Sequence, residues 1–339
     1  MDRRGEIARV LRGARGERLP RALFGAGRWA CRQTGLRVEH LRENPELFAE
    51  TLAGFFGALD TDIVFAGSGL NCFPAEAIGG DLALNGWQAP LLAAPVIREM
   101  RDAQRLEKVD IAESPHALAL LEMIAGLRRR LPDRFLCATA WGPFTWAMIL
   151  CDGDLLKEKT KTDRAFVGAV CDLGVRLSAA LLRPLVQQGL IDGICVADGA
   201  TTLIPDDLYR EVVLPREKLL FAQAGSHGVA RFLHQCGDTR SQLKLYPDTG
   251  ADCISLDATV DLHEAYALYH RRVVTAGNVD VVKHVCDGDP AQLSAAVTAS
   301  LAGIPDPFSK FILLPSCDLP PETPRRNAEA FLACADRVG

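Results

Sequence analysis

The feature that most constrains the fold of this chain is the alternation of short apolar runs with longer segments of helical periodicity. Continuous apolar runs of strand length are typical of parallel strands that are covered on both faces. Between these runs, apolar residues recur every three or four positions, as on one face of a helix. The runs lie at 62–66, 135–139, 193–197, 230–234, 253–256, 273–276 and 310–314, and the clearest helical segments are 115–130 and 165–188.

Strand–helix units repeated over about 280 residues fit either a closed (β/α)8 barrel or an open doubly wound sheet. The chain has no G-x-G-x-x-G after an early strand and no G-x-x-x-x-G-K-[ST], so doubly wound nucleotide-binding folds lose their usual support. We therefore predict a single (β/α)8 TIM barrel at residues 61–339. A mostly helical extension, residues 1–60, is expected to pack on this barrel as a lid or cap.

Charge and hydropathy exclude several classes of partner. A net charge of −5 over 339 residues argues against general binding to nucleic acid or to anionic membranes. No apolar run approaches the roughly 18 residues that span a bilayer. The arginine-rich residues 1–24 lack the apolar core of a signal peptide. We expect a cytoplasmic protein with neither a nucleic-acid nor a membrane partner.

Eleven cysteines are the unusual part of the composition. Because their number is odd and their spacing suggests no disulfide scaffold, we interpret them as free thiols in a reducing cytosol. His234 and Cys236 are two residues apart at a strand end, so their side chains point to the same side. Cys317 follows the last strand, which ends on the same rim of a barrel. One imidazole and two thiolates with a fourth position open is the pattern of a catalytic zinc site, although an isolated H-x-C pair more often only packs.

Three further polar residues follow strand runs and are expected at the same rim, where barrel enzymes carry their chemistry. Asp198, Asp257 and Asn278 are our candidates for catalytic residues, with helix capping or loop closure as the alternative roles. Glu76 is a candidate for ligand binding, with a place at a helix start as its alternative.

Several motifs resemble landmarks of one superfamily. Residues 27–35, GRWACRQTG, are similar to the N-terminal arginine motif of uroporphyrinogen decarboxylase, and further similarities follow in the expected order at 44–47 (NPEL), 141–145 (WGPFT) and 277–280 (GNVD). The resemblance covers essentially the whole chain and implies a single (β/α)8 barrel. Within it, Arg32 matches the first arginine of the motif and would contact an anionic substrate or a corrinoid carboxamide, while Leu36 holds the place of the second.

The chain departs from the decarboxylase where the substrate would bind. The decarboxylase has an aspartate after its first strand, whereas residues 65–70 here read FAGSGL. Its active-site tyrosine corresponds to about Ile149, and its C-terminal histidine falls at Cys317. Without these groups and the second arginine, binding a substrate with many carboxylates is physically unfavourable.

The departures resemble instead the cobalamin-dependent methyltransferases of the superfamily. Residues 233–238, LHQCGD, are similar to the H-x-C-G motif of that branch, and 314–324, LPSCDLPPETP, to its C-terminal motif. The resemblance implies that His234, Cys236 and Cys317 bind zinc. It also implies methyl transfer between the corrinoid (cobalamin) of a separate partner protein and a small molecule, either a thiol such as coenzyme M or tetrahydrofolate. A tetrapyrrole enzyme of the decarboxylase type and a non-catalytic corrinoid-binding or metal-storage protein are the alternatives.

Overall fold

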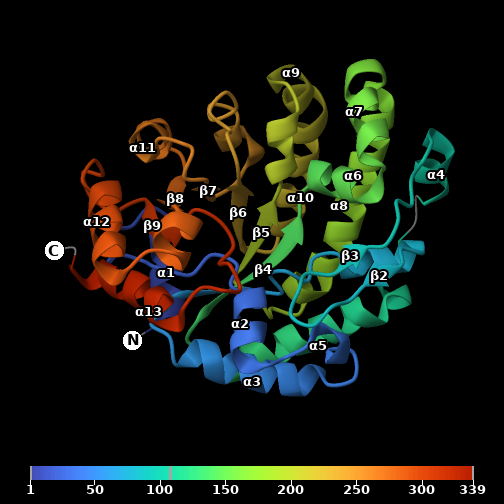
Figure 1. Cartoon of the computed structure of the whole chain (residues 1–339). Coiled ribbons are helices and arrows are strands. Elements are labelled where there is room, and N and C mark those ends of the chain that lie inside the picture. The colour runs from blue at the N-terminus through green and yellow to red at the C-terminus, as the bar shows by residue number, and fades with distance from the viewer. Residues whose placement is uncertain (1, 107–108, 338–339) are drawn as a thin grey trace.

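The strands form one central parallel sheet with helices around it (Figure 1). The structure is a computed structural model and describes residues 2–106 and 109–337. All seven predicted strands are present and pair in chain order, which confirms the predicted fold class. The largest difference is at the predicted run 273–276. There the pairing continues through Asn278 to Val279, because the backbone stays in register with the strand Phe311–Pro315. The strands of this sheet are β1 (Ile63–Ala66), β4 (Phe135–Trp141), β5 (Gly193–Ala197), β6 (Ala230–Gln235), β7 (Cys253–Leu256), β8 (Val274–Val279) and β9 (Phe311–Pro315).

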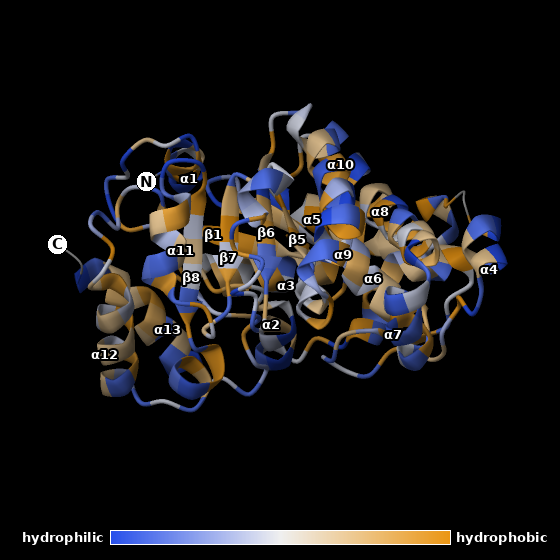
Figure 2. Cartoon of the chain, turned by 90° about the horizontal axis from the view of Figure 1, so that it is seen from above, coloured by the Kyte–Doolittle hydropathy of each residue, from blue (hydrophilic) through white to orange (hydrophobic). Residues whose placement is uncertain are grey.

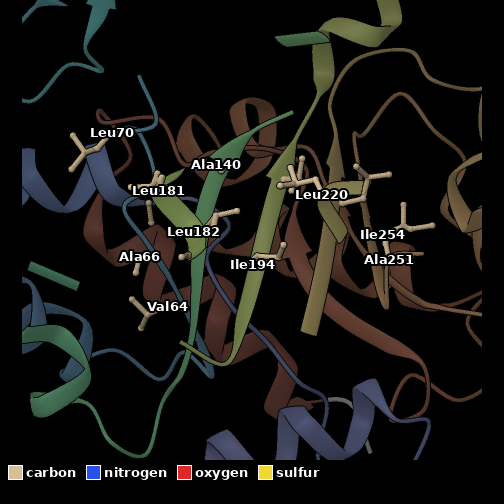
Figure 3. Packing of buried hydrophobic residues seen from close by; sticks show 14 of the residues in the cluster. Val64, Ala66, Leu70, Ala140, Leu181, Leu182, Ile194, Leu220, Ala251 and Ile254 are labelled. Atoms are coloured by element: carbon tan, nitrogen blue, oxygen red, sulfur yellow. The ribbon is translucent and has the colours of Figure 1, made fainter. Parts of the chain in front are cut away.

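Alternation along the strands produces two separate apolar layers. One residue set faces the barrel interior and includes Phe65, Phe135 and Phe232. The intervening residues pack against the helices, as Val64, Ile194 and their neighbours do in Figure 3. Both faces of each strand are therefore buried, which explains why the strands appear in the sequence as continuous apolar runs.

Three cysteines, Cys137, Cys195 and Cys253, lie in the interior layer with no exposed surface. Burial raises the pKa of each of these thiols. They act as small apolar side chains, as the sequence predicts. All eleven cysteines, which lie within the described residues, are free of disulfides.

The gap between β9 and β1 is closed by a short N-terminal segment, residues 20–22. The Leu313 N–H donates to the Pro20 carbonyl at 2.8 Å, and the Ala22 N–H donates to the Leu313 carbonyl at 3.1 Å. On the other side, the Asp62 N–H donates to the Arg21 carbonyl at 2.9 Å. This segment takes the eighth position of the barrel wall, whereas the prediction put all of residues 1–60 outside the wall. We infer that residues 1–60 and 61–339 form one structural domain.

The predicted helical segments 115–130 and 165–188 are confirmed as α5 and α8. The Ser114 hydroxyl accepts the Ala117 N–H at 3.1 Å and begins α5, while Asp163 accepts the Phe166 N–H at 3.0 Å and begins α8. A small antiparallel pair, β2 (Leu82–Ala83) and β3 (Leu91–Leu92), lies outside the barrel. The α-helices are α1 (Arg3–Leu11), α2 (Gly27–Thr34), α3 (Pro45–Gly57), α4 (Met100–Arg105), α5 (Pro115–Arg130), α6 (Pro143–Leu150), α7 (Gly153–Thr162), α8 (Arg164–Gln187), α9 (Asp206–Leu208), α10 (Leu214–Gly225), α11 (Leu262–Tyr269), α12 (Pro290–Leu301) and α13 (Arg325–Cys334).

Among the described residues, α8 alone has the length and apolar composition of a membrane-spanning helix. Its most apolar 18-residue window has a mean hydropathy of 1.7, and 72% of that window is buried. Viewed from above, this largely hydrophobic helix lies between the strands and the hydrophilic α4 (Figure 2). This burial is that of a core helix in a barrel.

Candidate metal centre

The three predicted metal ligands meet at the carboxyl-terminal rim of the barrel. His234 lies near the end of β6, Cys236 follows that strand directly, and Cys317 lies in the loop after β9. One ring nitrogen of His234 and the Sγ atoms of the two cysteines all lie within 4.8 Å of one another. The structure therefore brings together Cys317 and two residues that are 81 and 83 positions before it in the sequence.

The ring of His234 is held with one nitrogen directed at this cluster. Its Nδ1 lies 3.0 Å from the Ser255 hydroxyl on β7, and the ring of Phe24 stacks on it with centroids 4.0 Å apart. Its Nε2 is buried and has no hydrogen-bond partner in the part of the chain that the structure describes. An unpaired buried polar atom costs about 1–3 kcal/mol. An imidazole fixed through one nitrogen and free at the other is the usual form of a metal ligand.

The two thiols influence each other strongly. Contact with Cys317 lowers the pKa of Cys236 below its usual range, although burial opposes this effect. The same contact, together with burial, raises the pKa of Cys317. The two thiols are therefore close enough to share one proton in a hydrogen bond. A divalent cation at this position would replace that proton, since metal coordination deprotonates thiols.

Gly199, the first residue of the turn after β5, packs directly on Cys236. A Cβ built on Gly199 would lie 2.1 Å from the Cys236 Sγ, well inside van der Waals contact. A side chain at position 199 would therefore displace the Cys236 thiol, and a glycine avoids this clash.

The substitution Gly199→Ala should displace the Cys236 thiol and weaken zinc binding by about tenfold or more, as loss of ligand orientation does elsewhere. Competition with a chromophoric chelator measures this affinity. Gly54→Ala, in α3, is the matched control because a Cβ there meets no atom within 4 Å. An unchanged affinity in Gly199→Ala would contradict the placement of Cys236 in the centre.

The predicted catalytic residue Asp198 has no exposed surface. Its carboxylate accepts the N–H groups of Phe144 at 3.1 Å and Thr145 at 2.6 Å, and so it caps α6. Burial raises the pKa of Asp198, and these backbone bonds oppose the rise. The structure thus shows Asp198 in its alternative role as a helix cap. The capped helix, α6, follows β4, whereas Asp198 itself follows β5. The catalytic role of Asp198 stays a prediction.

The other two predicted catalytic residues meet at one rim loop, because Asp257 lies in the loop after β7 and Asn278 lies near the end of β8. Asn278 is 7% exposed, and its Nδ2 donates to the carbonyls of Asp257 at 2.9 Å and Val260 at 2.8 Å. The Asp257 carboxylate is half-buried and accepts the Thr259 N–H at 2.9 Å. It is close enough to Cys236 for its charge to raise the pKa of that thiol, as a minor effect. Asn278 therefore holds the loop, and Asp257 is the member of the predicted set with surface available to a ligand.

Arg32 and Glu76 have partners other than the metal cluster. The Arg32 Nη1 donates to Glu322 at 2.6 Å, and its guanidinium lies 5.0 Å from the ring centroid of Trp87. The Glu76 carboxylate lies 3.0 Å from His116 Nδ1 and accepts the Ser114 hydroxyl at 2.9 Å. Burial acts to raise the pKa of Glu76, but its bonds with His116 and Ser114 outweigh this and lower it. The ligand-binding roles of both residues stay predictions.

Two pieces of the site were missed by sequence reasoning. Phe24 and Ser255 orient His234, and neither residue lies in one of the sequence motifs described above. Asp318, directly after Cys317, accepts the Ala26 N–H at 2.8 Å and faces Arg28 Nε at 3.3 Å, which ties the ligand loop to the start of α2. The only available signal was the position of Asp318 inside the C-terminal motif.

Comparison with known proteins now places the chain. The family model for uroporphyrinogen decarboxylase (URO-D) matches residues 3–338. The chain belongs to the uroporphyrinogen decarboxylase family. The predicted resemblance is thereby confirmed over essentially its full extent.

Members of the URO-D family similar to this chain carry two kinds of name. The uroporphyrinogen decarboxylase of Nocardioides sp. is 30% identical over 293 residues, which cover 80% of each chain. The methylcobamide:CoM methyltransferase MtbA of Methanosarcina acetivorans is 26% identical over 252 residues, covering 73% of this chain and 71% of that protein. Among solved structures, a methyltransferase from Methanosarcina mazei superposes with a TM-score of 0.86 over 99% of both chains at 19% identity, which shows the shared barrel fold.

Proposed function

We propose that this URO-D family member is a zinc-dependent methyltransferase that moves a methyl group between a methylated corrinoid protein and a small acceptor. The acceptor is a thiol such as coenzyme M, or tetrahydrofolate. The observation that carries the proposal is the cluster of His234, Cys236 and Cys317, with the His234 Nε2 buried and unpaired beside two thiols. Similarity to MtbA, whose name states methyl transfer from a methylcobamide to CoM, supports the corrinoid.

The donor set fits zinc. Two soft thiolates and one imidazole suit zinc and disfavour magnesium or calcium, which prefer oxygen ligands. His234 Nε2 and the Sγ atoms of Cys236 and Cys317 would hold the ion, and three protein ligands leave one position for a substrate. When bound, zinc would lower the pKa of an acceptor thiol so that the thiolate is present at neutral pH.

The residues around the cluster keep it ready for the ion. Ser255 and Phe24 fix the orientation of the His234 ring, so little reordering is needed on binding. Asn278 holds the rim loop, which presents the half-buried Asp257 carboxylate beside the cluster. In this proposal Asp257 orients the acceptor, and Asp198 and Asn278 support the rim without contacting substrate.

A decarboxylase-like tetrapyrrole enzyme is the second candidate, favoured by the 30% identity to the Nocardioides enzyme. The site argues against it. Residues 65–70 supply no carboxylate after β1, and Arg32 is engaged by Glu322 and Trp87. The proposal accordingly names a corrinoid protein and a small-molecule acceptor as partners, without nucleic acid or membrane, in the cytoplasm.

The test combines metal content with an acceptor panel. We expect about one zinc per chain. We also expect methyl transfer from free methylcobalamin to at least one member of a panel of thiols and tetrahydrofolate, with the transfer lost on chelation and restored by zinc. The proposal is refuted if the purified protein contains no zinc and binds none when zinc is added back. Bound corrinoid without transfer to any acceptor would instead identify a corrinoid-binding protein.

A further inference from the structure

Gln235, the last residue of β6, lies between His234 and Cys236 in the sequence. Its side chain points away from the barrel interior into a buried polar cluster against α10. It has no exposed surface, and neither do Glu217 on α10 or Thr201 in the turn after β5. Gln235 Nε2 donates to Glu217 Oε1 at 3.3 Å. Its Oε1 accepts the Thr201 hydroxyl at 3.0 Å. Both ends of this amide are therefore held.

Glu217 is an unusual residue for this position. Its Oε2 accepts the hydroxyl of Tyr209 at 2.6 Å, and no lysine or arginine of residues 2–106 and 109–337 forms an ion pair with it. Burial, together with the nearby charge of Asp198, raises its pKa well above the usual range. A buried carboxyl without a cation is unfavourable unless its hydrogen bonds are satisfied. Here those bonds run to Tyr209 and Gln235, and the buried carboxyl of Asp198 also contacts Glu217.

Thr201 connects the same cluster to Cys236 by a second route, through the turn after β5. It lies two residues after Gly199, whose backbone packs on the Cys236 Sγ. Its carbonyl accepts Gln242 Nε2 at 3.0 Å, and Gln242 Oε1 accepts the Tyr246 hydroxyl at 3.0 Å. The β6 backbone and the Gly199 turn are thus fixed to one network of buried hydrogen bonds.

We propose that Gln235, held by Glu217 and Thr201, is a positioning residue that sets the relation between the His234 ring and the Cys236 thiol. Its side chain fixes the peptide groups on either side of it, and these groups carry the two ligands. Metal affinity depends on such outer contacts because a ligand displaced by a fraction of an ångström binds poorly. This inference rests on the proposed metal centre and extends its control to α10.

The test compares variants of Glu217 with a packing control. Glu217→Leu leaves Gln235 Nε2 without its acceptor. We expect the zinc Kd to rise by about 10- to 100-fold and the absorption bands of the Co²⁺-substituted protein to shift. Glu217→Gln keeps an acceptor oxygen for Gln235 Nε2 and places an amide donor beside the Tyr209 hydroxyl, whose oxygen can accept. It should stay within about threefold of the wild-type Kd, with unchanged bands.

Leu220→Ala is the matched control, because Leu220 is a buried apolar residue on the same helix and belongs to the helix–strand layer (Figure 3). It should lower Tm without changing the zinc Kd or the Co²⁺ bands. Thr201→Val removes the hydroxyl that donates to Gln235 Oε1 and is the second test, which serves if Glu217→Leu does not fold. We expect it to raise the Kd by about tenfold.

The outcomes separate this inference from the proposed function. A wild-type chain that binds neither zinc nor Co²⁺ refutes both. A wild type that binds zinc, with wild-type Kd and bands in Glu217→Leu or in Thr201→Val, overturns the positioning role alone. An equal rise in Kd for Leu220→Ala would also overturn it, because the effect would then follow from lost packing.

Discussion

Replacing Cys317 with serine is expected to reduce bound zinc from about one equivalent per chain to less than about a tenth, and methyl transfer by about a hundredfold or more. Cys317 is one of three ligands, and a serine hydroxyl does not ionise near neutral pH as a metal-bound thiol does. Elemental analysis of the purified variant measures the zinc, and transfer from methylcobalamin measures the activity.

Cys286→Ser provides the control for this substitution. Cys286 is also only partly buried, and it lies in the π-helical turn Val281–Cys286 outside the metal cluster. Its serine variant should retain a full equivalent of zinc and wild-type transfer. Full zinc occupancy in Cys317→Ser would remove Cys317 from the centre and with it the main support for the proposed function.

The second large effect is expected for Phe24→Ala. The ring of Phe24 is 5% exposed and packs between Phe65, at a centroid distance of 4.8 Å, and His234, at 4.0 Å. Its removal leaves a cavity, for which the free energy of unfolding falls by about 3–5 kcal/mol. It also frees the His234 ring, so zinc binding should weaken by about tenfold. Denaturant unfolding of the metal-free protein and chelator competition measure the two effects separately.

Phe135→Ala distinguishes these two effects. Phe135 lies in the same interior layer and contacts Phe232, with centroids 6.1 Å apart. This variant should lose comparable stability while keeping its zinc affinity. Equal losses of affinity in the two alanine variants would mean that Phe24 acts only through stability.

The strands and the proximity of His234, Cys236 and Cys317 were predictable because each depends on local pattern. Apolar runs buried on both faces reveal β1 and β4–β9, and the H-x-C spacing places two side chains on one side of β6. Cys317 followed once the strand ends were assigned to one rim. These inferences need only the order of strands in a barrel.

The remaining features depend on which elements become neighbours. Residues 20–22 contain Pro20 and Arg21, so they do not read as a strand, and only pairing with β9 and Asp62 gives them that role. The cap that Asp198 supplies to α6 crosses from one strand to the helix after another. The contact of Gln235 with Glu217 likewise depends on how α10 packs. A single sequence contains no local signal for such contacts.

Closure of the wall by residues 20–22 has a consequence for biosynthesis. Ribosomes make the chain from its N-terminus, yet the bond between Ala26 and Asp318 joins residues separated by 292 positions. The side of the early segment that faces β9 must therefore wait, unpaired, until β9 has left the exit tunnel, and contacts of such long range slow folding. Cys317 emerges directly after β9. Completion of the barrel and completion of the proposed metal centre thus become one late event, so a nascent chain should acquire its ion only after translation has passed this point.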